Sequence, residues 1–596
     1  MKRTVFFTFG CWLWALALVA APAFPIPVTV MQGDGTLLTV VQRGDEFHHW
    51  TETLDGALVV STARGYCIAR IDAAGRLSAT EVLAHELAQR GNGELAAIRE
   101  QSVRRALFYE KGKEMASKRR AVSIDDKMMY LPHTGNVRIL TILAAFQDVG
   151  FTVNNPAEAF DQLLNGEEQL DMGNRNQLNW TSVRQYFETC SHGQFSPQFD
   201  VVGPITLPER MAYYGGEKKN GSDDNFSDFC KDAVNEAREL VPDWTVYDNN
   251  GDGDVELVCV IFAGYGQNQG GADSTIWAKA SFRYQKLNDN QRIYRFNCCS
   301  ELFHPQYPDY INGTGVFIHE FSHCMGLPDL YATTPEAYVD NQGMESYSIM
   351  DYGLFNYNGF APCAYTAWEQ ETMGWTEIVD VRDMMTGGSC QISDIVPLLE
   401  GGKAYKIVNR NNDLDYIVME NIQQRGLNLK SDGHGLLVYH VDYPNAYANM
   451  TDSPNNQPGH PSVAVVPAGG LFINTLNPNN SYSSKEKKAY MAAALFPGTK
   501  GVTSLTAQMD LPNYYFYDGD VQKPVGFMVS DISEDAETGN ISFIISPDET
   551  TGINETRIQE DNRLPIYDLQ GRRVYGKLKA GIYISHGKKM LTRVKK

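Results

Sequence analysis

Residues 315–331 read GVFIHEFSHCMGLPDLY and constrain the fold more than any other stretch of the chain. Through Cys324 the pattern is helical, and His319 and His323 stand four residues apart, which places both imidazoles on one helix face. Two imidazoles directed at one point predict a bound metal ion, and zinc suits these ligands. Glu320 lies beside the first histidine, where its carboxylate can reach a water near the metal and act as a general base.

The residues after this helix offer a third ligand. Gly326 follows the second histidine and can take a left-handed conformation that ends the helix. The chain then presents Asp329, whose carboxylate is placed to return to the metal. A glutamate further on, Glu369 in the helical pattern AYTAWEQETMGW, is a competing ligand, and both assignments stay open at this point. A catalytic site would also leave one position on the metal for water.

A second motif, SYSIMDYG, contains Met350 in an expected turn. A methionine alone more often fills a core. In combination, however, the order HExxHxxGxxD and then S-I-M-x-Y resembles the metzincin clan of zinc peptidases. In that clan the methionine turn forms an apolar floor beneath the metal, and a tyrosine such as Tyr352 can approach it in a catalytic role. Asp329 stands where other metzincins carry a third histidine.

Several longer segments resemble one family, the M6 or immune inhibitor A-like secreted metallopeptidases. They are SVRQYFETCSHGQFSPQFDVVGPITLP, WTVYDNNGDGDVELVCVIFAGYG, HEFSHCMGLPDLY and HGLLVYHVDY, and the similarity covers about residues 30–545. The resemblance implies an endopeptidase that hydrolyses proteins or peptides with one catalytic zinc ion and is made as a latent precursor.

The N-terminus has the form of a signal peptide over residues 1–23. Lys2 and Arg3 precede a long apolar run, and Ala21-Pro22-Ala23 has the small-x-small pattern that signal peptidase cuts. The alternative is a single membrane anchor, but no basic cluster follows the apolar run. No other run has the apolar length of a membrane span. We therefore expect export through the Sec pathway to the cell surface or the medium, with no stable membrane span after cleavage.

Residues 24–135 combine short strand patterns with a charged helical stretch that carries Arg104-Arg105 and Lys118-Arg119-Arg120. These basic residues could simply form a solvated helix face. In a secreted chain with a metal motif downstream, we interpret the region as a pro-segment with an exposed processing site.

The rest of the chain predicts a multidomain protein. Helices and strands alternate over 136–385, which predicts an α/β or α+β catalytic domain of metzincin-like fold, and short strands over 386–546 predict an all-β, sandwich-like domain. A polar linker, 547–562, leads to a tail, 563–596, with an alternating apolar pattern. The tail resembles the C-terminal sorting domains of Bacteroidetes proteins, which implies the type IX secretion machinery as a partner. The alternative is an extra strand pair on the preceding domain.

The segment DNNGDGDVE predicts a structural calcium site. Acidic and amide side chains alternate around a turn in the manner of the first part of an EF-hand loop, and the candidate ligands are Asp248, Asn250, Asp252, Asp254 and Glu256. Cys259 stands where an EF-hand carries its bidentate glutamate, so a complete EF-hand is not expected. The alternative is an acidic turn before a strand.

The net charge of −21 argues against nucleic acid or an anionic membrane as a partner. Two classes of function therefore remain. One is the secreted zinc endopeptidase, and the other is a secreted or surface adhesin or glycan-binding protein with a degenerate or structural metal site. An intact Glu320 favours the enzyme, because a structural zinc needs no base beside its ligand.

Overall fold

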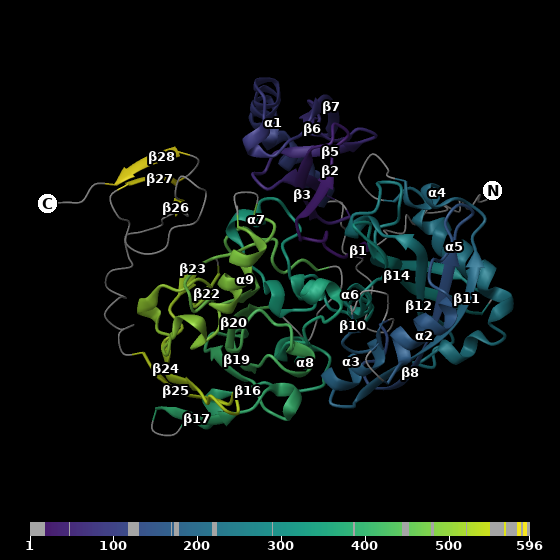
Figure 1. Ribbon diagram of the computed structural model, residues 1–596. Helices are drawn as coiled ribbons and strands as arrows, with labels where there is room; N and C mark the ends of the chain where they lie inside the picture. The colour runs from purple at the N-terminus through teal and green to yellow at the C-terminus, as the bar shows by residue number, and fades with distance from the viewer. Residues whose placement is uncertain are drawn as a thin grey trace, which may run out of the picture.

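The computed structural model describes residues 18–46, 48–116, 130–167, 170–171, 178–216, 223–288, 290–385, 388–443, 452–477, 482–519, 521–548, 566–567, 581–585 and 588–592. Figure 1 shows three main parts: a blue and teal part around a large sheet, a green to yellow part beside it, and a purple N-terminal part on top. This multidomain mixed α/β architecture agrees with the prediction.

A mixed sheet forms the centre of the blue and teal part. Its strand order is β1 (Leu18–Ala20), β13 (Lys279–Lys286), β14 (Arg292–His304), β12 (Val255–Tyr265), β8 (Gly135–Ala145) and β11 (Phe195–Thr206), and β15 (Tyr307–Ile311) pairs with β14. The pairs β14–β12, β12–β8 and β8–β11 are parallel, whereas β13 and β1 are antiparallel additions at one edge. This edge is the one that contacts the helix of the two histidines, α6 (Thr314–Cys324).

Helices cover both faces of this sheet, which explains the near-continuous apolar runs of β8 and β12. Ile139 and Leu257 belong to the core on the side of α2 (Pro156–Asn165), α3 (Val183–Cys190) and α6. Leu140 and Val258, the next residue of each strand, belong to the core on the side of α4 (Met211–Gly215) and α5 (Phe226–Ala237). Alternate residues of a strand point to opposite faces, so each strand supplies both cores.

The helix α6 is buried along its whole length. It packs on β13 and β14 and against the 3₁₀ segment η7 (Tyr352–Gly359). The approach to η7 is close enough that a Cβ on Gly315 would lie 2.0 Å from the carbonyl oxygen of Leu354. Glycine is therefore required in the first turn of the helix that carries the two histidines.

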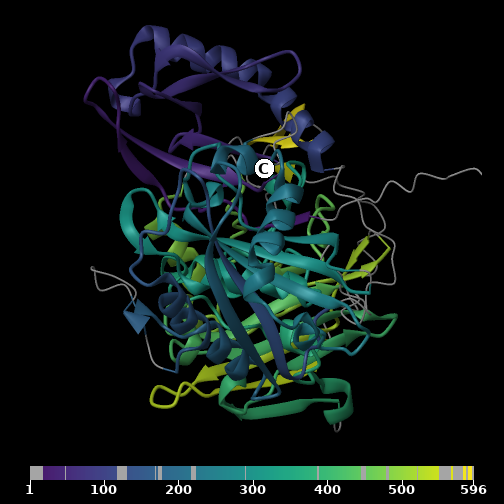
Figure 2. The ribbon, with the colours of Figure 1, turned by 90° about the vertical axis from the view of Figure 1, so that its right-hand side faces the viewer.

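The predicted pro-segment folds as an antiparallel meander of β2 (Val28–Met31), β3 (Leu37–Gly44), β4 (His49–Thr53), β5 (Leu58–Thr62), β6 (Gly65–Ile71) and β7 (Leu77–Leu83), packed against α1 (Asn92–Ala116). Gln101 of α1 donates from Nε2 to the carbonyl oxygens of Leu58 and Ala69 and so fixes the helix on the sheet. In Figures 1 and 2 this unit lies on one side of the molecule. The basic group Lys118-Arg119-Arg120 lies outside the described residues.

The β-rich region contains two facing sheets, as predicted for a sandwich. One sheet has the order β16 (Val379–Asp380), β18 (Tyr405–Asn409), β19 (Asn412–Ile422), β20 (Gly435–Asp442) and β21 (Val463–Val465), and the other has β17 (Cys390–Ile395), β25 (Ile541–Pro547) and β24 (Phe527–Glu534). Ile417 and Ile541 belong to one core between the sheets.

Two details of the β-rich region correct the prediction. The region is not all β, because α9 (Ser484–Ala492) lies within it and begins with a capping box between Ser483 and Glu486. Its first strand, β16, also precedes residue 386 and pairs with β18. A single core includes Val418 and Leu437 of this region together with Trp368 of α8 (Ala367–Thr372), so the two regions pack against each other without a break.

The two ends of the chain are described only in part. Residues 18–20 form β1 on the edge of the central sheet, and Ala21 and Phe24, which follow, are buried. The first seventeen residues of the predicted signal peptide and most of the linker lie outside the described part. In the tail, β26 (Ile566–Tyr567), β27 (Gly581–Ser585) and β28 (Lys588–Thr592) form an antiparallel sheet. No helix of the described part is long and apolar enough to cross a membrane.

Candidate metal centre and active site

The two histidines of α6 are oriented by backbone carbonyl groups. Nδ1 of His319 donates to the carbonyl oxygen of Ile349 at 2.7 Å, and Nδ1 of His323 donates to that of Leu327, also at 2.7 Å. A carbonyl oxygen only accepts, so each Nδ1 carries the proton and each Nε2 keeps its lone pair. Both side chains are fully buried. The imidazoles are therefore fixed in the form that binds a metal.

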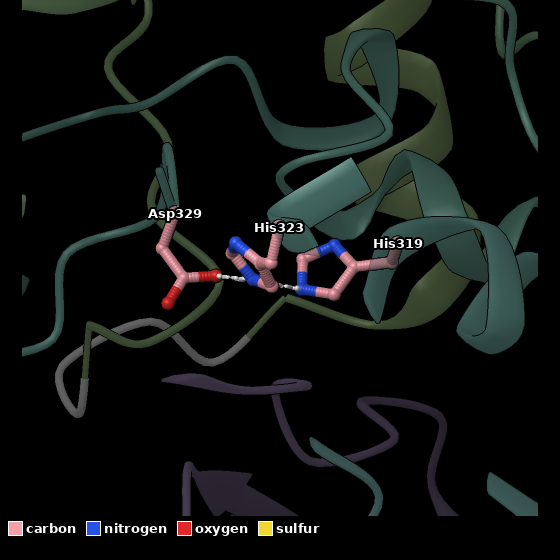
Figure 3. A group of neighbouring side chains, drawn as sticks. All are labelled: His319, His323 and Asp329. Carbon is pink, nitrogen blue, oxygen red and sulfur yellow. Dashed lines mark hydrogen bonds and ion pairs between the residues drawn. The ribbon is translucent and has the colours of Figure 1, made fainter. Parts of the chain in front are cut away.

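Three electron-rich atoms meet at one point (Figure 3). The Nε2 atoms of His319 and His323 lie 3.2 Å apart, and Oδ1 of Asp329 lies 3.4 Å from the first and 3.2 Å from the second. Two lone pairs and a carboxylate oxygen repel one another unless a cation lies between them. Two nitrogens and one oxygen are a ligand set that zinc accepts, so the residues fit this metal.

The charge states of these residues also suit a cation. Burial lowers the pKa of His319. Burial alone would raise the pKa of Asp329, but the imidazoles of His323 and His319 outweigh this effect and lower it. Metal ligands must be free of protons, and both shifts favour the deprotonated form.

Asp329 reaches the imidazoles because the chain turns sharply after α6. Gly326 has a φ of +109°, a value that favours glycine, and its N–H donates to the carbonyl oxygen of His323 at 2.9 Å. The N–H of Leu327 donates back to Ser322 at 3.1 Å. These bonds close the helix end, and the next residues pass beside the two Nε2 atoms.

Glu320 lies in the same buried region. Its side chain is fully buried, and neither carboxylate oxygen accepts a hydrogen bond from the residues that the structure describes. Burial raises its pKa well above the usual range, Asp329 raises it further, and the backbone of Ala280 and Ala21 acts in the opposite direction. A buried carboxyl group without a side-chain partner requires an explanation, and a role in proton transfer is one.

The competing ligand Glu369 is used elsewhere. It accepts from the N–H and the hydroxyl of Thr366 at 2.6 and 2.9 Å, which forms the capping box of α8, and from the hydroxyl of Ser348. Among the described residues, the group that could hold a metal ion contains Asp329 and not Glu369.

Met350 lies in a turn close to the metal site, since its carbonyl oxygen accepts from the N–H of Leu330, next to Asp329. Tyr352 is buried in the wall of a cavity of about 260 Å³, and the ammonium of Lys487 lies 4.9 Å above its ring. Tyr352 is therefore near a cavity that Pro25 and Pro27 also line, and its catalytic role stays a prediction.

The five residues of the expected calcium loop mainly accept hydrogen bonds from the backbone. Asp248 accepts from Gly251, Asp252 and Gly253, while Glu256 accepts from the N–H groups of residues 249 and 250. Among the described residues, no group of three carboxylates gathers in this loop at metal-ligand spacing. The other candidate ligands, Asn250, Asp252 and Asp254, likewise accept from backbone N–H groups. Calcium binding here stays a prediction.

Comparison with known protein families agrees with this geometry. Residues 151–376 match the family described as Immune inhibitor A peptidase M6, catalytic domain. The chain contains an M6 peptidase domain. The matched range includes α6, Asp329 and Met350, and it supports the assignment to the M6 metallopeptidases that the resemblance suggested.

Two curated relatives extend this finding. The chain is 24% identical over 256 residues to Immune inhibitor A of Bacillus thuringiensis subsp. alesti, which covers 38% of this chain and 37% of that protein. It is 29% identical over 222 residues to the Pre-pro-metalloprotease PrtV of Vibrio cholerae serotype O1, which covers 33% of this chain and 24% of that protein. The chain thus spans well under half the length of both relatives.

One charged cluster near α6 of the M6 domain was not predicted from the sequence. Lys279, Asp223 and Glu46 meet in the interior, although they come from distant parts of the chain. The available signal was a lysine inside the apolar strand segment IWAKASF, because a buried lysine needs a partner.

Proposed function

We propose that this protein is a zinc-dependent endopeptidase that hydrolyses protein or peptide substrates. The observation that carries this proposal is the convergence of the Nε2 atoms of His319 and His323 and of Oδ1 of Asp329 beside the buried carboxyl group of Glu320. The match to the M6 catalytic domain and the metalloprotease relative support it.

In this proposal His319, His323 and Asp329 hold one zinc ion. When bound, zinc supplies a Lewis acid that polarises the peptide carbonyl and makes water acidic enough to attack at neutral pH. Glu320 takes a proton from the attacking water and passes it to the leaving amine. Its full burial limits its contact with bulk water, which would compete for that proton.

The protein's own groups also prepare this step before substrate arrives. The carbonyl oxygens of Ile349 and Leu327 hold the two imidazoles in one tautomer, so the ligand atoms need no reorganisation. Because Asp329 raises the pKa of Glu320, a cation that neutralises Asp329 would favour the ionised form of this base.

We further propose that the protein is made as a latent, exported precursor. Residues 24–135 would be the pro-segment, and the leader would direct export through the Sec pathway. The Vibrio relative is named a pre-pro-metalloprotease. Consistent with latency, Phe24, the first residue of this pro-segment, is buried in the chain. The tail, 563–596, would address the protein to the type IX machinery, for release or surface attachment.

The test of the enzymatic proposal is the change Glu320→Ala. We expect hydrolysis of casein to be abolished while zinc content stays near one ion per chain, because Glu320 moves protons without holding the metal. The isosteric change Glu320→Gln should give the same result. His323→Ala should lose both zinc and activity. Casein cleavage by Glu320→Ala at the rate of the parent would exclude this mechanism, whereas no cleavage by the trypsin-treated parent would favour the adhesin.

A further inference from the structure

A buried cluster of charged side chains joins the predicted pro-segment to the catalytic sheet. Nζ of Lys279 lies 2.6 Å from Oδ2 of Asp223, and it also donates to Oε1 of Glu46. The exposed fraction of each side chain is 1% or less. Oε2 of Glu46 and Oδ1 of Asp223 are buried and accept no hydrogen bond from the described residues. Two carboxyl groups thus share one ammonium, and each has an unsatisfied oxygen.

The three residues differ in whether they would stay with the enzyme. Lys279 begins β13, and Asp223 lies just before α5, so both belong to the catalytic part. Glu46 lies between β3 and β4 of the pro-segment. If the pro-segment leaves, Lys279 keeps Asp223 but loses one carboxylate partner. A buried ammonium has three donors, so the position of the Glu46 carboxylate must be filled by water or by another acceptor.

This position lies close to the proposed reaction site. Lys279 pairs with Ala20 across the two edge strands β13 and β1. The next residue, Ala21, donates to the carbonyl oxygen of Ala278, and its backbone lowers the pKa of Glu320. Lys279 also lowers the pKa of Glu320. The cluster around Lys279 therefore lies only one residue along the sheet edge from the backbone that is next to Glu320, the proposed general base.

A substrate can reach Lys279 at the edge of β13 that β1 covers, because Leu18–Ala20 belong to the predicted signal peptide and would leave with it. An extended peptide that pairs with β13 completes its backbone hydrogen bonds, as peptides do at exposed sheet edges. Residues directly opposite in an antiparallel pair place their side chains on the same face, about 5 Å apart at Cβ. The peptide residue opposite Lys279 would then extend toward the space that Glu46 occupies in the full-length chain.

We propose that Lys279 and Asp223 form a substrate subsite for an acidic side chain, and that Glu46 fills this subsite in the full-length protein. The subsite rests on the proposed peptidase function. A carboxylate suits it because its hydrogen bond to an ammonium is charge-assisted and stronger than that of a neutral amide. Glu46 then both mimics a substrate side chain and anchors the pro-segment.

Binding of a carboxyl group in the subsite is coupled to the uptake of a proton. Burial raises the pKa of Asp223 to about 7, with Lys279 lowering it and Glu46 raising it. The other titratable groups facing the cluster are the thiol of Cys298 on β14, which burial keeps neutral, the neighbouring Cys230 on α5, and Glu320 on α6. A second carboxyl group therefore binds together with a proton. Its binding weakens as the pH rises through about 7, whereas glutamine binding does not depend on this proton.

The experiment compares peptides that differ only by Glu or Gln at one position. A peptide cleaved by the trypsin-treated full-length protein is scanned position by position with Glu and Gln, at about pH 6 and about pH 8.5. At one position we expect kcat/KM to be about tenfold higher for Glu at the lower pH, and nearly equal for both at the higher pH. Lys279→Gln should abolish this preference. Lys286→Gln, an exposed lysine on the same strand, should keep it.

Two outcomes would overturn the subsite: no position that prefers Glu, or a preference of the same size in Lys279→Gln. Failure to cleave any peptide would contradict the peptidase function instead.

A second measurement, which does not depend on peptidase activity, tests whether Glu46 anchors the pro-segment. After the trypsin cut, the pro-segment fragment should co-elute with the catalytic part at about pH 6 and separate from it in Glu46→Lys. Glu81→Lys, an exposed carboxylate of the same segment, is the control. Co-elution of the Glu46→Lys fragment with the catalytic part would contradict the proposal that Glu46 anchors the pro-segment.

Discussion

At the scale of single residues, the metal site depends on the contrast between Asp329 and Glu369. Both carboxylates are fully buried, but they have different partners. Asp329 faces two Nε2 atoms, whereas Glu369 accepts from Thr366 and Ser348 and has a pKa raised by burial to about 7. The first lies where the proposed metal would bind, and the second stabilises the start of a helix.

This contrast predicts opposite effects on zinc. Asp329→Ala should weaken zinc binding by at least about tenfold, because even the loss of partners around a ligand has effects of that size. Glu369→Ala should leave zinc affinity unchanged and lower the free energy of unfolding by about 1 kcal/mol through the lost cap. Titration against a zinc chelator measures the first effect, and chemical denaturation the second. The reverse order of zinc affinities would assign the third ligand to Glu369.

At the scale of elements, the end of α6 determines whether Asp329, the proposed third ligand, reaches the two imidazoles. Gly326 has positive φ, and a Cβ there would only meet the ring of Tyr130 at 3.6 Å, an ordinary contact. The cost of a larger residue therefore comes from backbone strain and not from collision. That strain acts on the turn that leads to Asp329.

We predict that Gly326→Ala destabilises the fold by about 1–2 kcal/mol and also weakens zinc binding. Gly401→Ala is a matched control, since Gly401 also has positive φ, follows a short helix in the β-rich region, and leaves an added Cβ with nothing within 4 Å. It should lose similar stability without a change in zinc affinity. Thermal unfolding and chelator titration of both variants measure the two effects, and equal zinc affinities would contradict a specific role for this turn.

At the scale of the whole molecule, the predicted pro-segment contacts both other parts of the chain. The guanidinium of Arg43 donates to the carbonyl oxygen of Thr475 in the β-rich region, and the ring of Trp50 lies 6.1 Å from that of Tyr338. With the buried Glu46, these contacts hold the N-terminal unit over the chain that carries the active site. They explain how a segment remote in sequence could control access.

The predicted consequence is latency. The full-length chain beginning near Phe24 should be poorly active until it is cut within about residues 104–135, where basic residues lie in a polar segment. Activity before and after limited trypsin treatment, with sequencing of the new N-terminus, measures this. The uncut chain carrying Glu320→Ala sets the baseline. Full activity of the uncut chain would exclude an inhibitory pro-segment.

The sequence by itself determined the local features of this protein. The helix with His319, Glu320 and His323, the break at Gly326 and the buried strands of the mixed α/β core all follow from spacing along a few turns or a few residues. Such patterns are readable because neighbouring residues set backbone conformation and the face on which a side chain lies. The metzincin-like arrangement in detail stays a prediction.

Only the tertiary structure decided which distant residues meet. The sequence favoured Asp329 and left Glu369 as the alternative, and the structure directs the first to the imidazoles and the second to Thr366. Nothing in the sequence indicated that Glu46 would meet Lys279, because long-range pairing depends on how whole elements pack and not on local spacing. The partners that fix the imidazoles are backbone carbonyl groups, which every residue carries, so no sequence pattern could single them out.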